Sequence, residues 1–165
     1  WKGKDTLHEL FRPPFWPIDL SKGELVNAPK DDAPIVLSDN IEVRFFNAPH
    51  QNDAKLVVVD ILGKRICIMA DCENADGIPS KYLKNSDYLI YDGMYNDQEY
   101  VSHIGWGHST WEEGCRIANK NNVGTLIITH HDAKNSDAIL NDREEKAQLA
   151  FPATIFAKTG DRYQI

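Results

Sequence analysis

The feature that most constrains the fold is a change in the hydrophobic pattern at Ala70. Before it lie four short apolar or alternating runs, each typical of a strand: 35–37, 41–46, 55–62 and 65–70. Between the last two, Leu62-Gly63-Lys64 predicts a tight hairpin. After Ala70, predicted strands alternate with predicted helices: strands at 88–91, 123–129, 154–157 and 163–165, and helices at 109–121 and 137–150. This order predicts an α/β (α+β) fold, a mixed sheet covered by helices.

The helix boundaries rest on capping signals. Ser109 with Glu112 three residues later is typical of a capping box, and Ser136 precedes the second predicted helix. The first predicted helix is expected to face the core with Cys115, Ile117 and Ala118, and the second carries the apolar residues Ile139, Leu140, Ala147 and Leu149. The first 34 residues are rich in proline and aromatic side chains, which disfavours a central strand. We therefore divide the chain into an arm or lid at 1–34 and a folded unit at 35–165.

Charge and composition narrow the function. The 165 residues carry 18 basic and 25 acidic side chains, a net charge of −7, which disfavours binding to extended nucleic acid through its phosphates. No window has the roughly 18 uncharged apolar residues of a membrane span, so no membrane association is expected. Three cysteines do not make a disulfide framework in a chain of this size, which predicts a reducing, cytoplasmic location.

Candidate metal ligands follow the ends of predicted strands. His50, Asp71 and the pair His130-His131 each come just after such a strand. Loops at strand ends often hold metal or catalytic groups, and histidine with carboxylate suits zinc, iron or manganese. Because neighbouring residues of a strand point to opposite faces, only one histidine of the pair can face a shared site. We expect it to be His130, with His131 as the second choice.

His108 lies in the glycine-flanked segment Gly105-Trp106-Gly107-His108, just before a predicted helix. The glycines permit close approach of the backbone, and a helix N-terminus favours an anion such as phosphate. A histidine there is suited to act as a general acid. A plain role in capping the helix is the alternative.

Several segments together resemble the metallo-β-lactamase-fold hydrolases, in particular the phosphodiesterase-like and ribonuclease Z-like branch. They are, in order, 47–50 (NAPH), 69–73 (MADCE), 87–100 (DYLIYDGMYNDQEY), 105–111 (GWGHSTW) and 129–132 (THHD). The resemblance implies a four-layer αββα sandwich with two divalent metal ions, with zinc as the first choice and iron or manganese as the alternatives. It also implies His50 and His130 as ligands, Asp71 as the bridging and catalytic carboxylate, and His108 as the group that assists at the scissile phosphate.

The chain departs from that pattern in one major respect. It contains no His-x-His-x-Asp-His motif, the family's first signature, so it corresponds to the C-terminal half of the domain. From this we expect a fragment that binds metal weakly or not at all and is inactive alone. The uncovered surface predicts a homodimer.

Three functions remain open at this stage. The leading one is metal-dependent hydrolysis of a phosphodiester in a small molecule. The second is hydrolysis of a thioester, lactone or lactam on the same fold, which does not need His108. The third is a catalytically silent interaction or regulatory module.

Overall fold

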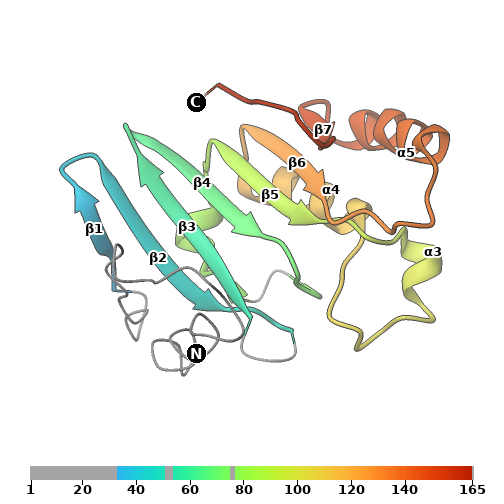
Figure 1. Cartoon of the computed structure of the whole chain (residues 1–165), viewed down its shortest axis with the longest axis horizontal. Coiled ribbons are helices and arrows are strands. Elements are labelled where there is room, and N and C mark those ends of the chain that lie inside the picture. The colour runs from blue at the N-terminus through green and yellow to red at the C-terminus, as the bar shows by residue number, and fades with distance from the viewer. Residues whose placement is uncertain (1–32, 51–53, 75–76, 165) are drawn as a thin grey trace, which may run out of the picture.

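The computed structural model describes residues 33–50, 54–74 and 77–164; the predicted arm at 1–34 lies almost entirely outside them. The described part forms one seven-stranded sheet whose spatial order, β1 to β7, is the order of the strands along the chain (Figure 1). Its strands are β1 Ile35–Ser38, β2 Ile41–Asn47, β3 Lys55–Ile61, β4 Lys64–Met69, β5 Tyr88–Asp92, β6 Thr125–Thr129 and β7 Thr154–Phe156. Its helices are α2 Ser80–Leu83, α3 Asp97–Tyr100, α4 Trp111–Asn121 and α5 Asp137–Ala150.

The strands β1 to β4 form an antiparallel meander. The predicted hairpin is present: only Leu62 and Gly63 separate β3 from β4, and both have positive φ, at 50° and 77°. Two consecutive positive φ values are typical of the type I′ turn, whose twist matches that of the strands. Because each antiparallel pairing reverses the direction, β2 and β4 run the same way.

From β4 onward the sheet is parallel, with β4, β5, β6 and β7 paired in that order. Helix α4 connects β5 to β6, and α5 connects β6 to β7. The carboxyl ends of β2, β4, β5 and β6 therefore lie along one edge of the sheet, which we call the carboxyl edge. Figure 1 shows the loops that follow β4, β5 and β6 gathered there.

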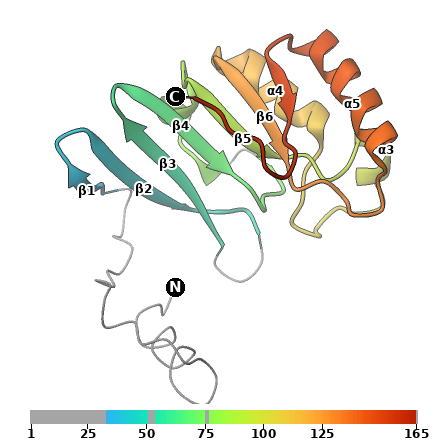
Figure 2. The same ribbon diagram turned by 45° about the horizontal axis from the view of Figure 1, so that its top comes forward.

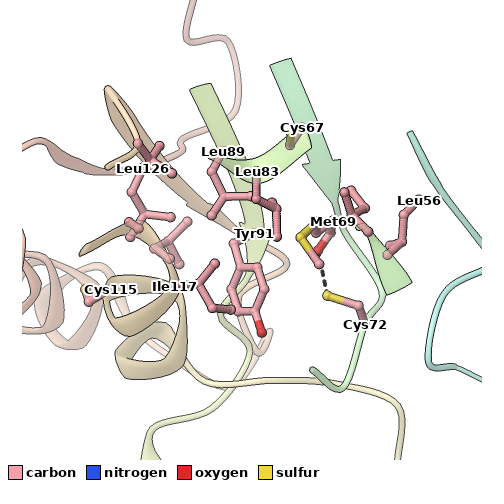
Figure 3. Packing of buried hydrophobic residues seen from close by; sticks show 14 of the residues in the cluster. Leu56, Cys67, Met69, Cys72, Leu83, Leu89, Tyr91, Cys115, Ile117 and Leu126 are labelled. Carbon is pink, nitrogen blue, oxygen red and sulfur yellow. Dashed lines mark hydrogen bonds between the residues drawn. The ribbon is translucent and has the colours of Figure 1, made fainter. Parts of the chain in front are cut away.

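One face of the sheet packs against the helices and holds the core. Alternate strand residues point to it and are fully buried, among them Leu56, Met69, Leu89, Tyr91 and Leu126 (Figure 3). Helix α4 approaches closely at Gly114, where an added Cβ would lie 2.9 Å from Ile128 and 3.0 Å from Tyr91. We call this the closed face.

The opposite face carries a row of apolar residues in register across six strands: Phe45, Val57, Ile68, Ile90, Ile127 and Ile155. All except Ile127 are only half-buried. The described helices α4 and α5 lie on the other side (Figure 2). Residues after β7 run back toward β5, where the Tyr88 hydroxyl donates a hydrogen bond to the Gln164 carbonyl oxygen at 3.2 Å. We call this second face the open face. The expected mixed α/β sheet, with helices on one face, is confirmed.

Some local expectations were wrong. The N-cap of α4 is Thr110, whose side chain accepts from the Glu113 amide, because the Ser109 hydroxyl is buried in a hydrogen bond with Tyr91. Residues 163 and 164 form no strand with β7.

The structure also bears on the three cysteines and on membrane-spanning helices. All three cysteines are buried free thiols, and burial raises the pKa of Cys67 and of Cys115 to about 11. In the described part of the chain, no helix has the length and apolar character needed to cross a membrane.

Candidate metal centre

Three strands deliver polar residues to the carboxyl edge. Asp92 is the last residue of β5, His130 follows β6 directly, and Asp71 lies two residues beyond β4. Asp71 and His130 have left-handed backbone conformations, with φ of 52° and 61°. Residues other than glycine seldom adopt this conformation, and such positions concentrate at functional sites. The backbone turns sharply where each of these two side chains enters the edge.

Four side chains meet there: Asp71, Asp92, His108 and His130 each offer one metal-ligating atom, and these atoms all lie within 4.8 Å of one another. The His130 Nε2 atom is 2.7 Å from Asp71 Oδ1, and His108 Nδ1 is 3.8 Å from the same oxygen. The rings of His108 and His130 stack with centroids 4.8 Å apart. Sequence reasoning named three of the four and missed Asp92.

Asp92 is fully buried, and both oxygens of its carboxylate accept hydrogen bonds. It accepts hydrogen bonds from His108 Nδ1 at 2.9 Å, from the Met94 amide at 3.1 Å and from the Cys72 amide at 3.3 Å. Burial raises the pKa of Asp92, and the hydrogen bond from His108 opposes that shift. A carboxylate this enclosed is suited to orienting His108.

Asp71 differs from Asp92 in being accessible. Its side chain is 49% exposed and lies beside the two histidines His108 and His130. A carboxylate oxygen that faces two imidazoles and solvent is open to a cation. Of the two carboxylates at the edge, Asp71 is therefore the better metal ligand.

His108 is held by the loop before it as well as by Asp92. The Glu73 carboxylate accepts hydrogen bonds from the amides of Gly105 and Gly107 and from the Tyr100 hydroxyl. Both glycines have positive φ, at 85° and 88°, so glycine is the residue that suits each turn. With His108 Nδ1 assigned as the donor to Asp92, the Nε2 atom is the one left to carry or release a proton.

The other two candidate histidines, His50 and His131, lie in different surroundings. The His50 ring is 5.6 Å from the His108 ring, and an added Cβ on Gly107 would meet it at 2.5 Å. His50 thus borders the four-residue cluster without belonging to it. His131 stacks on Phe156 with its Nε2 3.3 Å from the Ala157 carbonyl oxygen, and burial lowers its pKa. The structure places His130, and not His131, beside Asp71.

The cluster fits a divalent cation. Two imidazoles and two carboxylates are donors that zinc, iron and manganese accept. Tetrahedral ligands bound through bonds of about 2.1 Å lie about 3.4 Å apart, so the widest pair of the cluster, at up to 4.8 Å, has to close by about 1.4 Å to bind one ion. The Nδ1 atom of His130 is buried and has no hydrogen-bond partner among the described residues, which leaves that imidazole incompletely satisfied.

Comparisons with known proteins identify the family of the chain. The beta-lactamase superfamily domain matches residues 5–131. Ribonuclease Z of Gemmatimonas aurantiaca is 33% identical over 103 residues, 62% of this chain and 32% of that protein. The chain thus spans about a third of the length of this relative.

Two solved structures share the fold. The metallo-beta-lactamase fold protein YhfI of Bacillus subtilis gives a TM-score of 0.67 at 22% identity, over 84% of this chain and 55% of that one. Zn(2+)-bound PqqB of Methylobacterium extorquens gives 0.62 at 17% identity, over 81% of this chain and 50% of that one.

The fold and its edge cluster define a protein of metallo-β-lactamase architecture. The chain belongs to the beta-lactamase superfamily, and it is similar in sequence to ribonuclease Z.

Proposed function

We propose that this chain forms part of a metal-dependent hydrolase that cleaves a phosphodiester. The observation that carries the proposal is the convergence of Asp71, Asp92, His108 and His130 at the carboxyl edge. In the proposed division of roles, Asp71 and His130 hold metal with His50 as a further ligand. Asp92 and His108 form the pair that handles the proton.

A divalent ion bound at this cluster would supply Lewis acidity toward a phosphoryl oxygen and lower the pKa of a nearby water. Zinc is the first choice, because one neighbour of the same fold is described as Zn(2+)-bound; iron and manganese suit the same donors. A site for two ions needs about six groups, more than the four in the described cluster. We therefore expect weak metal binding and no hydrolysis from these 165 residues alone.

The residues of the chain itself supply the proton chemistry. Asp92 accepts from His108 Nδ1 and fixes the orientation of the imidazole ring. The Nε2 atom then carries the proton that the leaving oxygen of a phosphodiester requires. A thiolate leaves without such a donor, so the pair favours the phosphodiester over a thioester. The alkoxide of a lactone and the amine of a lactam also take up a proton, so the His108→Ala measurement below is needed to separate those substrates.

The substrate is open between two sizes of phosphodiester. The net charge of −7 favours a small molecule, as the sequence predicts. The matched relatives bear the name ribonuclease Z, which adds an RNA linkage to the proposal and weighs against the expectation that extended nucleic acid is excluded. Hydrolysis of a cyclic mononucleotide and of a short RNA by the natural gene product would separate them.

Metal titration tests the assignment of ligands. Zinc and manganese are added to the wild-type chain, to Asp71→Asn and to His131→Asn, with calorimetric detection. We expect weak binding by the wild type, at least about a tenfold loss in Asp71→Asn because a ligand is removed, and no change in the matched His131→Asn control. Equal affinity of Asp71→Asn and wild type would contradict the assignment.

An activity measurement tests the role of His108. In the natural gene product, His108→Ala should lower phosphodiester turnover by about 100-fold or more while the metal content stays the same. Loss of metal together with turnover would instead identify His108 as a ligand. A metal content near zero in the wild type would favour a silent interaction module.

A further inference from the structure

Three large apolar side chains are exposed in the loop that leads to His108. Val101, Ile104 and Trp106 are 71%, 66% and 62% exposed, and all lie within six residues. Single exposed apolar residues are ordinary on protein surfaces, but a group beside a functional site indicates something that binds there. The largest of the three, Trp106, is also the one nearest in sequence to His108.

The backbone around Trp106 is held in place. Glu73 accepts hydrogen bonds from the amides of Gly105 and Gly107, the residues on either side, and the Trp106 amide donates to the His103 carbonyl oxygen at 3.1 Å. The indole is thus presented to solvent from a fixed segment. Fixing a side chain before binding lowers the entropic cost of the contact that it later makes.

Ring contacts tie the indole to the proposed proton donor. The Trp106 ring meets His103 edge to face at 4.8 Å, His103 stacks on Tyr95 at 4.4 Å, and Tyr95 lies 6.4 Å from His108. Tyr95 itself is buried, so Trp106 is the exposed end of this series. Two residues separate the Cα atoms of Trp106 and His108 by at most about 7.6 Å. The separation between the indole and His108 is therefore on the scale of the separation between a nucleobase and the phosphate next to it.

We propose that Trp106 is the surface on which a nucleobase next to the scissile phosphodiester stacks. The inference rests on the proposed function and names its substrate class, a phosphodiester that carries a purine or pyrimidine ring. An acidic chain gains little from neutralising phosphates, whereas stacking on an aromatic ring needs no charge. The competing occupant of Val101, Ile104 and Trp106 is a protein surface, including a second copy of this chain.

Indole N–H signals in a nitrogen-15 NMR spectrum test the proposal directly. The chain has four tryptophans, and the Trp106 signal is identified by its absence in Trp106→Phe. Adenosine 5′-monophosphate is titrated into the wild type, with ribose 5-phosphate as the probe that lacks the base. We expect a saturable shift of the Trp106 signal with the nucleotide only, and no shift of the buried Trp111 signal.

Variants give the size of the effect. Trp106→Ala should weaken nucleotide binding by about 5- to 150-fold, the loss of one base–aromatic stack, whereas Trp106→Phe should keep most of it. Because Trp106 is exposed, neither variant should change the far-ultraviolet circular dichroism spectrum. Nucleotide affinity equal in Trp106→Ala and wild type would overturn the proposal.

Two further outcomes separate the alternatives. A Trp106 signal that does not shift on addition of the nucleotide would overturn base stacking. A signal that shifts only with protein concentration would also overturn it, and would assign the surface to contact with a second copy of the chain. Failure of the proposed function would be detected by a different experiment, the metal titration, as equal metal affinity in Asp71→Asn and the wild type. A nucleotide-dependent Trp106 shift alongside unaltered metal binding in that variant would retain the base site and reject the hydrolase.

Discussion

The two faces of the sheet both carry apolar side chains, but these side chains are more deeply buried on the closed face than on the open face. On the closed face, Leu56, Leu89 and Leu126 are fully buried beneath helices. On the open face, Val57, Ile68 and Ile90 occupy the alternate positions of the same strands and are half-buried. Strands that are apolar on both sides are typical of sheets covered on both faces. The open face therefore has the chemistry of an interior surface, whereas the closed face holds the fully buried core of the described part.

The comparison is sharpest for two isoleucines on neighbouring strands. Ile128 of β6 is fully buried on the closed face, and Ile90 of β5 is half-buried on the open face. We expect Ile128→Ala to lower the free energy of unfolding by about 2–5 kcal/mol, because it leaves a cavity. Ile90→Ala should cost about half as much or less, since part of that side chain already meets water. Urea unfolding of both variants measures the difference; equal losses would show that the open face is covered.

The second prediction concerns the two carboxylates at the carboxyl edge. Asp92→Asn should lower the free energy of unfolding by about 1–3 kcal/mol, because an amide N–H₂ replaces an oxygen that accepts from buried donors. Asp71→Asn is the matched control and should stay within about 0.5 kcal/mol of the wild type, because Asp71 is half exposed. Thermal unfolding of both variants checks this. A larger loss for Asp71→Asn would reverse the roles assigned to the pair.

The third prediction tests whether the open face self-associates. The expected homodimer would bury Ile68, so Ile68→Lys should raise its dissociation constant by more than about tenfold, because an unpaired charge is costly to bury. Leu149→Lys, at a site on α5 that is 88% exposed, is the control. Sedimentation velocity at several concentrations provides the measurement. A wild type that is monomeric throughout would remove the homodimer from consideration.

The smallest expected effect on stability comes from the ion pair between Asp97 of α3 and Arg116 of α4. A hydrogen bond from Arg116 lowers the pKa of Asp97 below its ordinary value of 3.8. A lowered folded-state pKa contributes stability that is present above pH 3.8 and is lost as the pH falls through the lower folded value. The stability difference between wild type and Asp97→Asn should therefore shrink between pH 6 and pH 2, as followed by urea midpoints. A difference that is constant over that range would contradict this account.

Much of the fold follows from local pattern. The turn at Leu62-Gly63, the helix at 137–150 and the strand at 88–91 could be predicted because hydrophobic periodicity and turn residues act over a few neighbours. The short helices α2 and α3 escaped prediction, since four residues give no periodicity. The N-cap of α4 was placed one residue early because the competing partner of Ser109 is Tyr91, 18 residues away in sequence.

The site shows the same limit. Asp71, His108 and His130 could be proposed from strand ends and resemblance, whereas Asp92 was passed over although it ends the apolar run Tyr88–Tyr91. The signal was present: a carboxylate that closes a buried parallel strand next to β4 and β6. What the sequence could not supply is the burial of Asp92 and its three hydrogen-bond donors, which depend on the loops after β4 and before α4. His50 as a ligand stays a prediction.

The identity of spatial and sequence order among the seven strands has a consequence for biosynthesis. Each strand pairs with the one made just before it, so no strand has to wait for a distant partner to leave the ribosome. We expect the meander β1–β4 to resist protease in nascent chains stalled after residue 110, before β6 and His130 are exposed. Protease sensitivity of β3 and β4 at that length would argue against stepwise growth. In this order the carboxyl edge is completed last, when Thr125–His130 joins a sheet that already holds Asp71 and Asp92.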